Sequence, residues 1–260
     1  MKKTGGRICL VFLALLLPLV SVGAAERPCH WYCIRTKAHR QPPIPPEFAF
    51  VEELGGYFLD RTHGDGASEK VVYLTFDAGY ENGNVAKILD ILKEKGVAAA
   101  FFVLSHLVTA NGDVVLRMKN EGHLVCNHTA HHKDLSFATR EDVAREIKAL
   151  EDVYRELTGE EMAHYFRPPE GSFSRGMLQH VRDLGYQTVF WSFAYADWDN
   201  NKQPSVDTAM RTVMDNVHNG AVLLLHPTSK TNVEILPRVI DELRAEGYRF
   251  GMLDELCVAR

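Results

Sequence analysis

Ionisable side chains stand at or just past the ends of several apolar segments of the sequence. Asp77 closes VVYLTFD, and His226 closes AVLLLH. A carboxylate can take a proton from water, and an imidazole, with its pKa near neutrality, can give one to a leaving group. Three more ionisable side chains follow apolar segments in the same way: His128, Arg167 and Asp197. The pattern indicates acid–base chemistry by residues from separate segments.

The segment NHTAHH at 127–132 carries a possible metal site. His128 and His132 are four residues apart, and one helical turn would bring both imidazoles to the same face. Such a pair can hold a divalent ion, with zinc the first choice. A pair of hydrogen-bonded structural histidines is the alternative.

Arg167 precedes two prolines in RPPEG. Proline restricts the residue before it to extended conformations, so the guanidinium would be held stiffly and could orient a carboxylate. Taken singly, Arg167 could also be a surface arginine and His226 a buried structural histidine.

The elements that must position these residues follow a β-then-α rhythm from Val71 onwards. Glycines after KEK, KNE, RDL and RAE indicate helix ends followed by strands. Strands are predicted at 71–77, 98–104, 123–128, 164–167, 186–193, 221–226 and 248–253, and helices near 84–95, 113–121, 139–157, 174–184, 205–218 and 232–246.

Repetition of this unit predicts an α/β fold with a parallel sheet covered by helices. Seven strands fit a distorted (β/α) barrel or an open doubly wound sheet. In a barrel the carboxyl ends of all strands ring one mouth. We therefore expect the ionisable residues to converge there.

Residues 1–25 have the pattern of a secretory signal peptide, with Lys2 and Lys3 before an apolar run and Ala24-Ala25 at the cleavage site. An uncleaved anchor is the alternative. Export across the cytoplasmic membrane is expected, to the outside or the cell wall. Residues 26–70 contain RQPPIPPEF and are predicted to wrap the domain at 71–257 as an extension.

Four cysteines follow the predicted cleavage site, and their spacing does not fix how they pair: Cys29, Cys33, Cys126 and Cys257. The net charge is −5, and there is no stripe of lysine and arginine, so nucleic-acid binding is not expected. We expect a monomer.

Five segments in this order, TFDAG, HTAHH, RPPEG, DW and LLLH, resemble the motifs of the polysaccharide deacetylase family (NodB-like, carbohydrate esterase family 4) over residues 70–255. The resemblance implies a distorted seven-stranded (β/α) barrel that hydrolyses N-acetyl groups. It implies Asp77 as general base, oriented by Arg167, and His226 as general acid, tuned by Asp197. It also implies His128 and His132 as metal ligands.

Longer segments, including TFDAGYENGN and YFRPPEGSFS, resemble the branch of the family that acts on N-acetylmuramic acid in spore cortex peptidoglycan. That branch implies formation of muramic δ-lactam during sporulation, after a peptidoglycan amidase has acted, and adds the forespore intermembrane space to the expected locations. Aromatic side chains near the predicted mouth could pack against sugar rings, with plain packing as the alternative: Tyr80 and Trp198 above all, then Trp191 and Tyr195.

Ala78 departs from the family pattern, in which a second aspartate completes the metal site. A metal held by two neutral imidazoles should be weakly held or dispensable. Cys126 is a minor candidate for a substitute ligand. Two rival functions stay open: a deacetylase of N-acetylglucosamine in peptidoglycan or chitin-like oligomers, and a glycan-binding relative without catalysis.

Overall fold

The computed structural model describes residues 27–258, without the side chains of Cys257 and Val258; the predicted signal peptide lies outside this range. Within it, seven parallel strands form one curled sheet in the order β7-β5-β4-β3-β2-β8, with β9 beside β2. The strands are β2 (Lys70–Ala78), β3 (Ala100–Val103), β4 (Leu124–Asn127), β5 (Ala163–Phe166), β7 (Gln187–Thr188), β8 (Ala221–Leu225) and β9 (Tyr248–Phe250). The predicted distorted barrel is confirmed.

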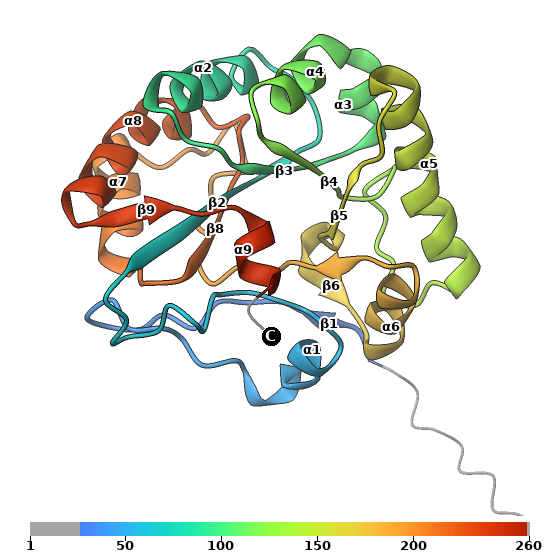
Figure 1. Cartoon of the computed structure of the whole chain (residues 1–260), viewed down its shortest axis with the longest axis horizontal. Helices are drawn as coiled ribbons and strands as arrows, with labels where there is room; N and C mark the ends of the chain where they lie inside the picture. Colours follow the sequence, from blue (N-terminus) through green and yellow to red (C-terminus); the bar gives the residue numbers. More distant parts are fainter. Residues whose placement is uncertain (1–26, 259–260) are drawn as a thin grey trace, which may run out of the picture.

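Helices surround the sheet (Figure 1). Four of them begin at a serine or threonine whose side chain accepts a hydrogen bond from the third helical N–H: Thr139, Ser174, Ser205 and Ser229. The glycines predicted to end helices all have positive φ: Gly96, Gly122, Gly185 and Gly247. The helices are α2 (Val85–Lys95), α3 (Ser105–Ala110), α4 (Gly112–Asn120), α5 (Arg140–Thr158), α6 (Arg175–Asp183), α7 (Val206–Asn216), α8 (Lys230–Ala245) and α9 (Leu253–Val258).

Strand β2 separates two apolar layers because its side chains alternate between the faces of the sheet. Leu74, Phe76 and Ala78 pack in the outer layer, against residues of the helices. Tyr73 packs in the inner layer. Asp77 lies between Phe76 and Ala78 and therefore points inward, to the mouth of the barrel.

The segment before the barrel, shown in blue in Figure 1, contains β1 (Cys29–His30), the 3-10 helix η1 (Pro46–Phe48) and α1 (Phe50–Glu53). β1 pairs with β6 (Ser172–Phe173), which follows the 3-10 helix η2 (Pro169–Gly171). Buried Trp31 stacks on Phe190, with ring centroids 4.4 Å apart. Tyr57 and Leu59 form single β-bridges to Val189 and Ala221. The segment thus lies across the gap between β7 and β8.

Two parts of the barrel differ from the prediction. The strand expected at 186–193 has only two residues in β7, because the chain then leaves the sheet and pairs singly, as Phe193 does with Leu223. The short helices α3 and α9 were not expected, since six residues carry too little periodicity to be recognised.

Candidate active site

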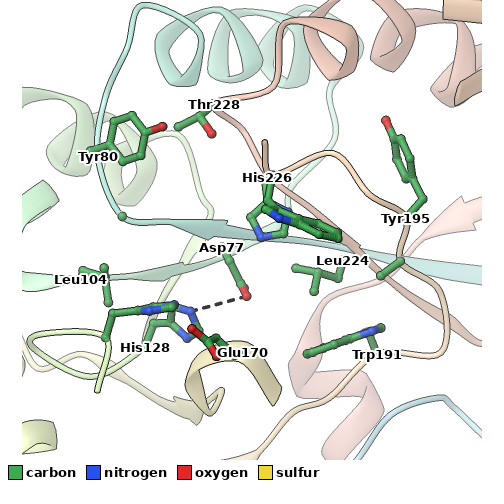
Figure 2. A pocket seen from close by; sticks show the side chains of 14 residues that line it. Asp77, Tyr80, Leu104, His128, Glu170, Trp191, Tyr195, Leu224, His226 and Thr228 are labelled. Atoms are coloured by element: carbon green, nitrogen blue, oxygen red, sulfur yellow. Dashed lines mark ion pairs between the residues drawn. The ribbon is translucent and has the colours of Figure 1, made fainter. Parts of the chain in front are cut away.

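A cleft of about 640 Å³ opens at the carboxyl ends of the strands (Figure 2). Asp77 stands near the end of β2, His128 just after β4 and His226 just after β8. In Figure 2 Asp77 lies between the two histidines. The residues lining the cleft come from six parts of the chain: Asp77, Gly79, Tyr80, Leu104, His128, His132, Glu170, Trp191, Ala194, Tyr195, Trp198, Leu224, His226 and Thr228.

Arg167 lies entirely beneath the cleft floor, with a side-chain exposure of 0%. Its Nη1 donates to Asp77 Oδ1 at 2.8 Å and its Nη2 to Thr75 Oγ1 at 2.9 Å. Its Nε donates to the Val189 carbonyl at 2.9 Å, and the guanidinium lies 4.1 Å from the Phe102 ring centroid. Hydrogen bonds from all three nitrogens and the ring of Phe102 therefore hold the guanidinium in one orientation, with Nη1 directed at Asp77.

The Asp77 carboxylate is held ionised by its surroundings. Burial opposes its ionisation, but the charge and hydrogen bond of Arg167 together with the nearby imidazoles outweigh burial, and the pKa of Asp77 lies below its usual value. Oδ1 is engaged by Arg167, whereas Oδ2 lies 3.6 Å from His128 Nε2. Oδ2 is thus the oxygen available to a water molecule.

His226 forms the second ionisable centre, together with Asp197. His226 Nδ1 donates to Asp197 Oδ1 at 2.7 Å, and the His226 backbone N–H donates to Oδ2 at 2.8 Å. Burial alone would lower the pKa of His226, but the hydrogen bond and charge of Asp197 raise it above its usual value. The proton on the other nitrogen, Nε2, is the one available to a leaving group.

His128 and His132 lie together on one wall of the cleft, with ring centroids 5.0 Å apart. The predicted helical turn is wrong. Thr129 and His132 have positive φ values of 70° and 55°, which no right-handed helix accommodates. The loop is held instead by Asn127 Oδ1, which accepts from the Thr129 N–H, and by Thr129 Oγ1, which accepts from the His132 N–H.

The two imidazoles could bind a divalent ion weakly, but they do not form a zinc site with three protein ligands. His128 Nδ1 donates a hydrogen bond to the Arg167 carbonyl at 2.8 Å, and burial lowers the His128 pKa to about 4. Nε2 is therefore unprotonated, and its lone pair faces the cleft as a metal ligand. Among the described side chains of residues 27–256, no group of three or more His, Cys, Asp and Glu is placed to hold a metal. Ala78 and Cys126 are both buried away from the cleft lining.

The predicted sugar-binding aromatics lie at the rim. Trp198 is 62% exposed and Tyr80 43% exposed, and both line the cleft, so their rings are open to a ligand there. Asn200 Nδ2 donates to the Tyr80 hydroxyl at 2.6 Å and ties the two rim loops together. The Trp198 ring lies 6.4 Å from the His226 ring, measured between centroids, so it is placed beside the acid.

Three residues of the site were not recognised from the sequence. Thr75, two residues before Asp77 on the same strand face, could have been found from strand alternation. Glu170 lines the cleft from η2 with a φ of 56°, and nothing in RPPEG indicates that backbone. Asn232 lies buried under His226 and Asp197, and its separation of 35 residues from Asp197 gave no signal of this contact.

Residues 64–189 match the family described as polysaccharide deacetylase. Peptidoglycan-N-acetylmuramic acid deacetylase PdaA of Bacillus subtilis (strain 168) is 37% identical over 245 residues, which are 92% of this chain and 91% of PdaA. The chain belongs to the polysaccharide deacetylase family. The solved structure of PdaA, described as a family 4 carbohydrate esterase, has a TM-score of 0.83 and covers 88% of this chain and 96% of its own.

Two further relatives show that the family includes enzymes with another substrate and proteins described as pseudoenzymes. A peptidoglycan-N-acetylglucosamine deacetylase of Bacillus cereus is 30% identical over 194 residues, or 73% of this chain and 89% of its own. A family 4 pseudoenzyme from Bacillus anthracis has a TM-score of 0.67 and 27% identity, over 73% of this chain and 66% of its own. Members of the family typically use a divalent metal and hydrolyse amide bonds, although pseudoenzymes occur.

Proposed function

We propose that this polysaccharide deacetylase removes the acetyl group from N-acetylmuramic acid in peptidoglycan, as a step towards muramic δ-lactam in spore cortex. The observation that carries the proposal is the pair of intact centres at one cleft. Arg167 orients Asp77 and helps to lower its pKa, and Asp197 orients His226 and raises its pKa. A site that had lost catalysis would have no need of both.

The reaction follows from the positions of these groups. A water molecule at Asp77 Oδ2 gives up a proton to the carboxylate while its oxygen attacks the acetyl carbonyl carbon. His226 then donates its Nε2 proton to the sugar nitrogen as the carbon–nitrogen bond breaks. Acetate and a free amine are the products. When a divalent ion is held by His128 and His132, it supplies polarisation of the carbonyl oxygen.

The choice of muramic acid is supported by similarity to PdaA, whose name states that substrate.

We further propose that the protein is exported as a monomer and acts on glycan strands from which an amidase has removed stem peptides. None of the helices in residues 27–258 has the length and apolar character that a bilayer crossing requires.

One feature of the cleft favours N-acetylglucosamine as a second candidate substrate. Peptide-free muramic acid carries a lactyl carboxylate, yet no lysine or arginine is among the residues that line the cleft in the described part of the chain. Glu170 instead contributes a carboxylate to the lining, beside Asp77 and His128 in Figure 2. Like charges repel, so this rim is unfavourable to a free lactyl group.

Mass spectrometry of muropeptides before and after incubation separates these functions. Peptide-free and peptide-bearing chains are compared, with Asp77→Asn as the matched inactive control. We expect loss of acetyl from muramic residues of peptide-free chains by the wild-type protein alone. Loss of acetyl from glucosamine residues only would overturn the substrate, whereas glycan binding without any acetate release would overturn catalysis.

A further inference from the structure

Asn232, in the first turn of α8, lies directly beneath the acid centre and is fully buried. Its Nδ2 donates to Asp197 Oδ2 at 2.6 Å and to the His226 carbonyl at 3.0 Å. Its Oδ1 accepts a hydrogen bond from the Tyr195 hydroxyl. Its two amide hydrogens and its oxygen are therefore all engaged.

The amide of Asn232 has one permitted orientation. The Asp197 carboxylate and the His226 carbonyl can only accept hydrogen bonds, so the amide nitrogen must face them. The hydroxyl of Tyr195 occupies the opposite side and donates to Oδ1. If the Asn232 amide were flipped, its Oδ1 would face two acceptors, the Asp197 carboxylate and the His226 carbonyl. The Tyr195 hydroxyl would then face the amide N–H groups. Tyr195 thus locks Asn232 from the side of the cleft.

Asn232 contacts both members of the acid centre. Asp197 Oδ2 accepts from two donors, the His226 backbone N–H at 2.8 Å and Asn232 Nδ2 at 2.6 Å, while Oδ1 accepts from the His226 ring. The second bond of Nδ2 holds the His226 carbonyl and so fixes the backbone that carries the ring. Ser229 Oγ accepts from the Asn232 N–H at 3.1 Å and anchors the turn itself.

We propose that Asn232, locked by Tyr195, is a positioning residue that sets the orientation and the proton affinity of the His226–Asp197 pair. The inference rests on the proposed role of His226 as general acid. A hydrogen bond from a neutral donor spreads the negative charge of Asp197 and so weakens its attraction for the imidazolium. Without that donor the carboxylate attracts the proton of His226 more strongly.

Other charged groups face His226, and Asn232 forms no hydrogen bond with them. Asp77 on β2 favours the protonated imidazole, and Arg167 after β5 disfavours it. Trp198 packs beside the ring without charge. A shift measured in an Asn232 variant therefore reports the Asp197 hydrogen bond.

The test compares Asn232→Ala, Tyr195→Phe and the control Asn216→Ala, whose Nδ2 binds the Thr212 carbonyl on α7. The His226 imidazole is titrated by NMR without substrate, and acetate release is followed against pH. For Asn232→Ala we expect the His226 titration and the alkaline limb to move upward by about 0.5–1 pH unit. We also expect kcat to fall roughly tenfold with little change in KM.

Tyr195→Phe keeps the amide but frees it to flip, so a smaller shift in the same direction is expected. It keeps the proposal testable if Asn232→Ala fails to fold. Unshifted His226 titrations in the folded variants would overturn the positioning role, even if kcat fell. Absence of acetate release from the wild-type protein would instead overturn the proposed function, and the NMR titration would still decide the role of Asn232.

Discussion

Replacement of Arg167 by methionine removes the fully buried partner of an ion pair and leaves Asp77 without its cation. The lost contacts include hydrogen bonds to Asp77, Thr75 and the Val189 carbonyl. Breaking a buried pair by removing one partner costs about 3–5 kcal/mol. Because backbone carbonyls are also left unpaired, we expect the upper part of that range for the decrease in the free energy of unfolding.

The same replacement changes the pH dependence of activity. Asp77 has a lowered pKa, so its carboxylate contributes stability above the pKa of the unfolded chain and loses it as pH falls through the folded pKa. Without Arg167, burial is no longer outweighed by a full opposing charge, and the pKa of Asp77 must rise. The acid limb of the activity profile, where the base becomes ionised, therefore moves to higher pH in Arg167→Met.

Chemical denaturation and acetate release against pH measure these two effects. Arg175→Met is the matched control, because Arg175 reaches Glu53 at 3.4 Å and both side chains are more than half exposed. Such an exposed pair contributes below about 1 kcal/mol, and the control should keep the wild-type acid limb. An Arg167→Met protein with wild-type stability and an unshifted acid limb would refute the reasoning about the buried pair.

Three more outcomes are expected. Asp77→Asn should lower kcat by about 10²–10⁴-fold, measured as acetate release, and a smaller loss would show that another group activates water. Protein purified without added metal should hold less than about one ion per chain by elemental analysis and should lose it to a chelator, because the two imidazoles lack a third protein ligand. His128→Ala should abolish this metal binding. Stoichiometric zinc that survives chelation of the wild-type protein would contradict the expectation. Trp198→Ala should raise KM for glycan oligomers by about 2–10-fold with kcat little changed, whereas an unchanged KM would exclude stacking on the sugar.

The barrel and the convergence of its ionisable residues were predictable because they follow from strand alternation and strand ends. Asp77 and His226 stand at the ends of two neighbouring buried strands, so the sheet itself brings them together. The path of the chain around His128 was not predictable. It depends on Asn127 and Thr129 bonding to nearby N–H groups, and a four-residue spacing does not distinguish such a loop from a helix.

Asn232 and Glu170 show a second limit of reading the sequence. Asn232 reaches Asp197, 35 residues earlier in the chain, only because α8 packs its first turn against the preceding loop. Glu170 is placed in the cleft by a left-handed backbone that any surface turn could have. Neither residue belongs to a periodic pattern, so tertiary structure alone assigns them to the site.

The segment before the barrel has a consequence for how the protein folds. Trp31 Nε1 donates to the Trp191 carbonyl across 160 positions, and Gln41 Nε2 donates to the Asn219 carbonyl across 178. Contacts of such sequence separation form late, because long loops must close first. We therefore expect the first part of the described chain to be synthesised to dock as late as β9, which pairs with β2 across an equal separation, and its arrival to fix the Trp191 wall of the cleft. Catalytic competence should appear in refolding experiments only after the barrel strands have paired.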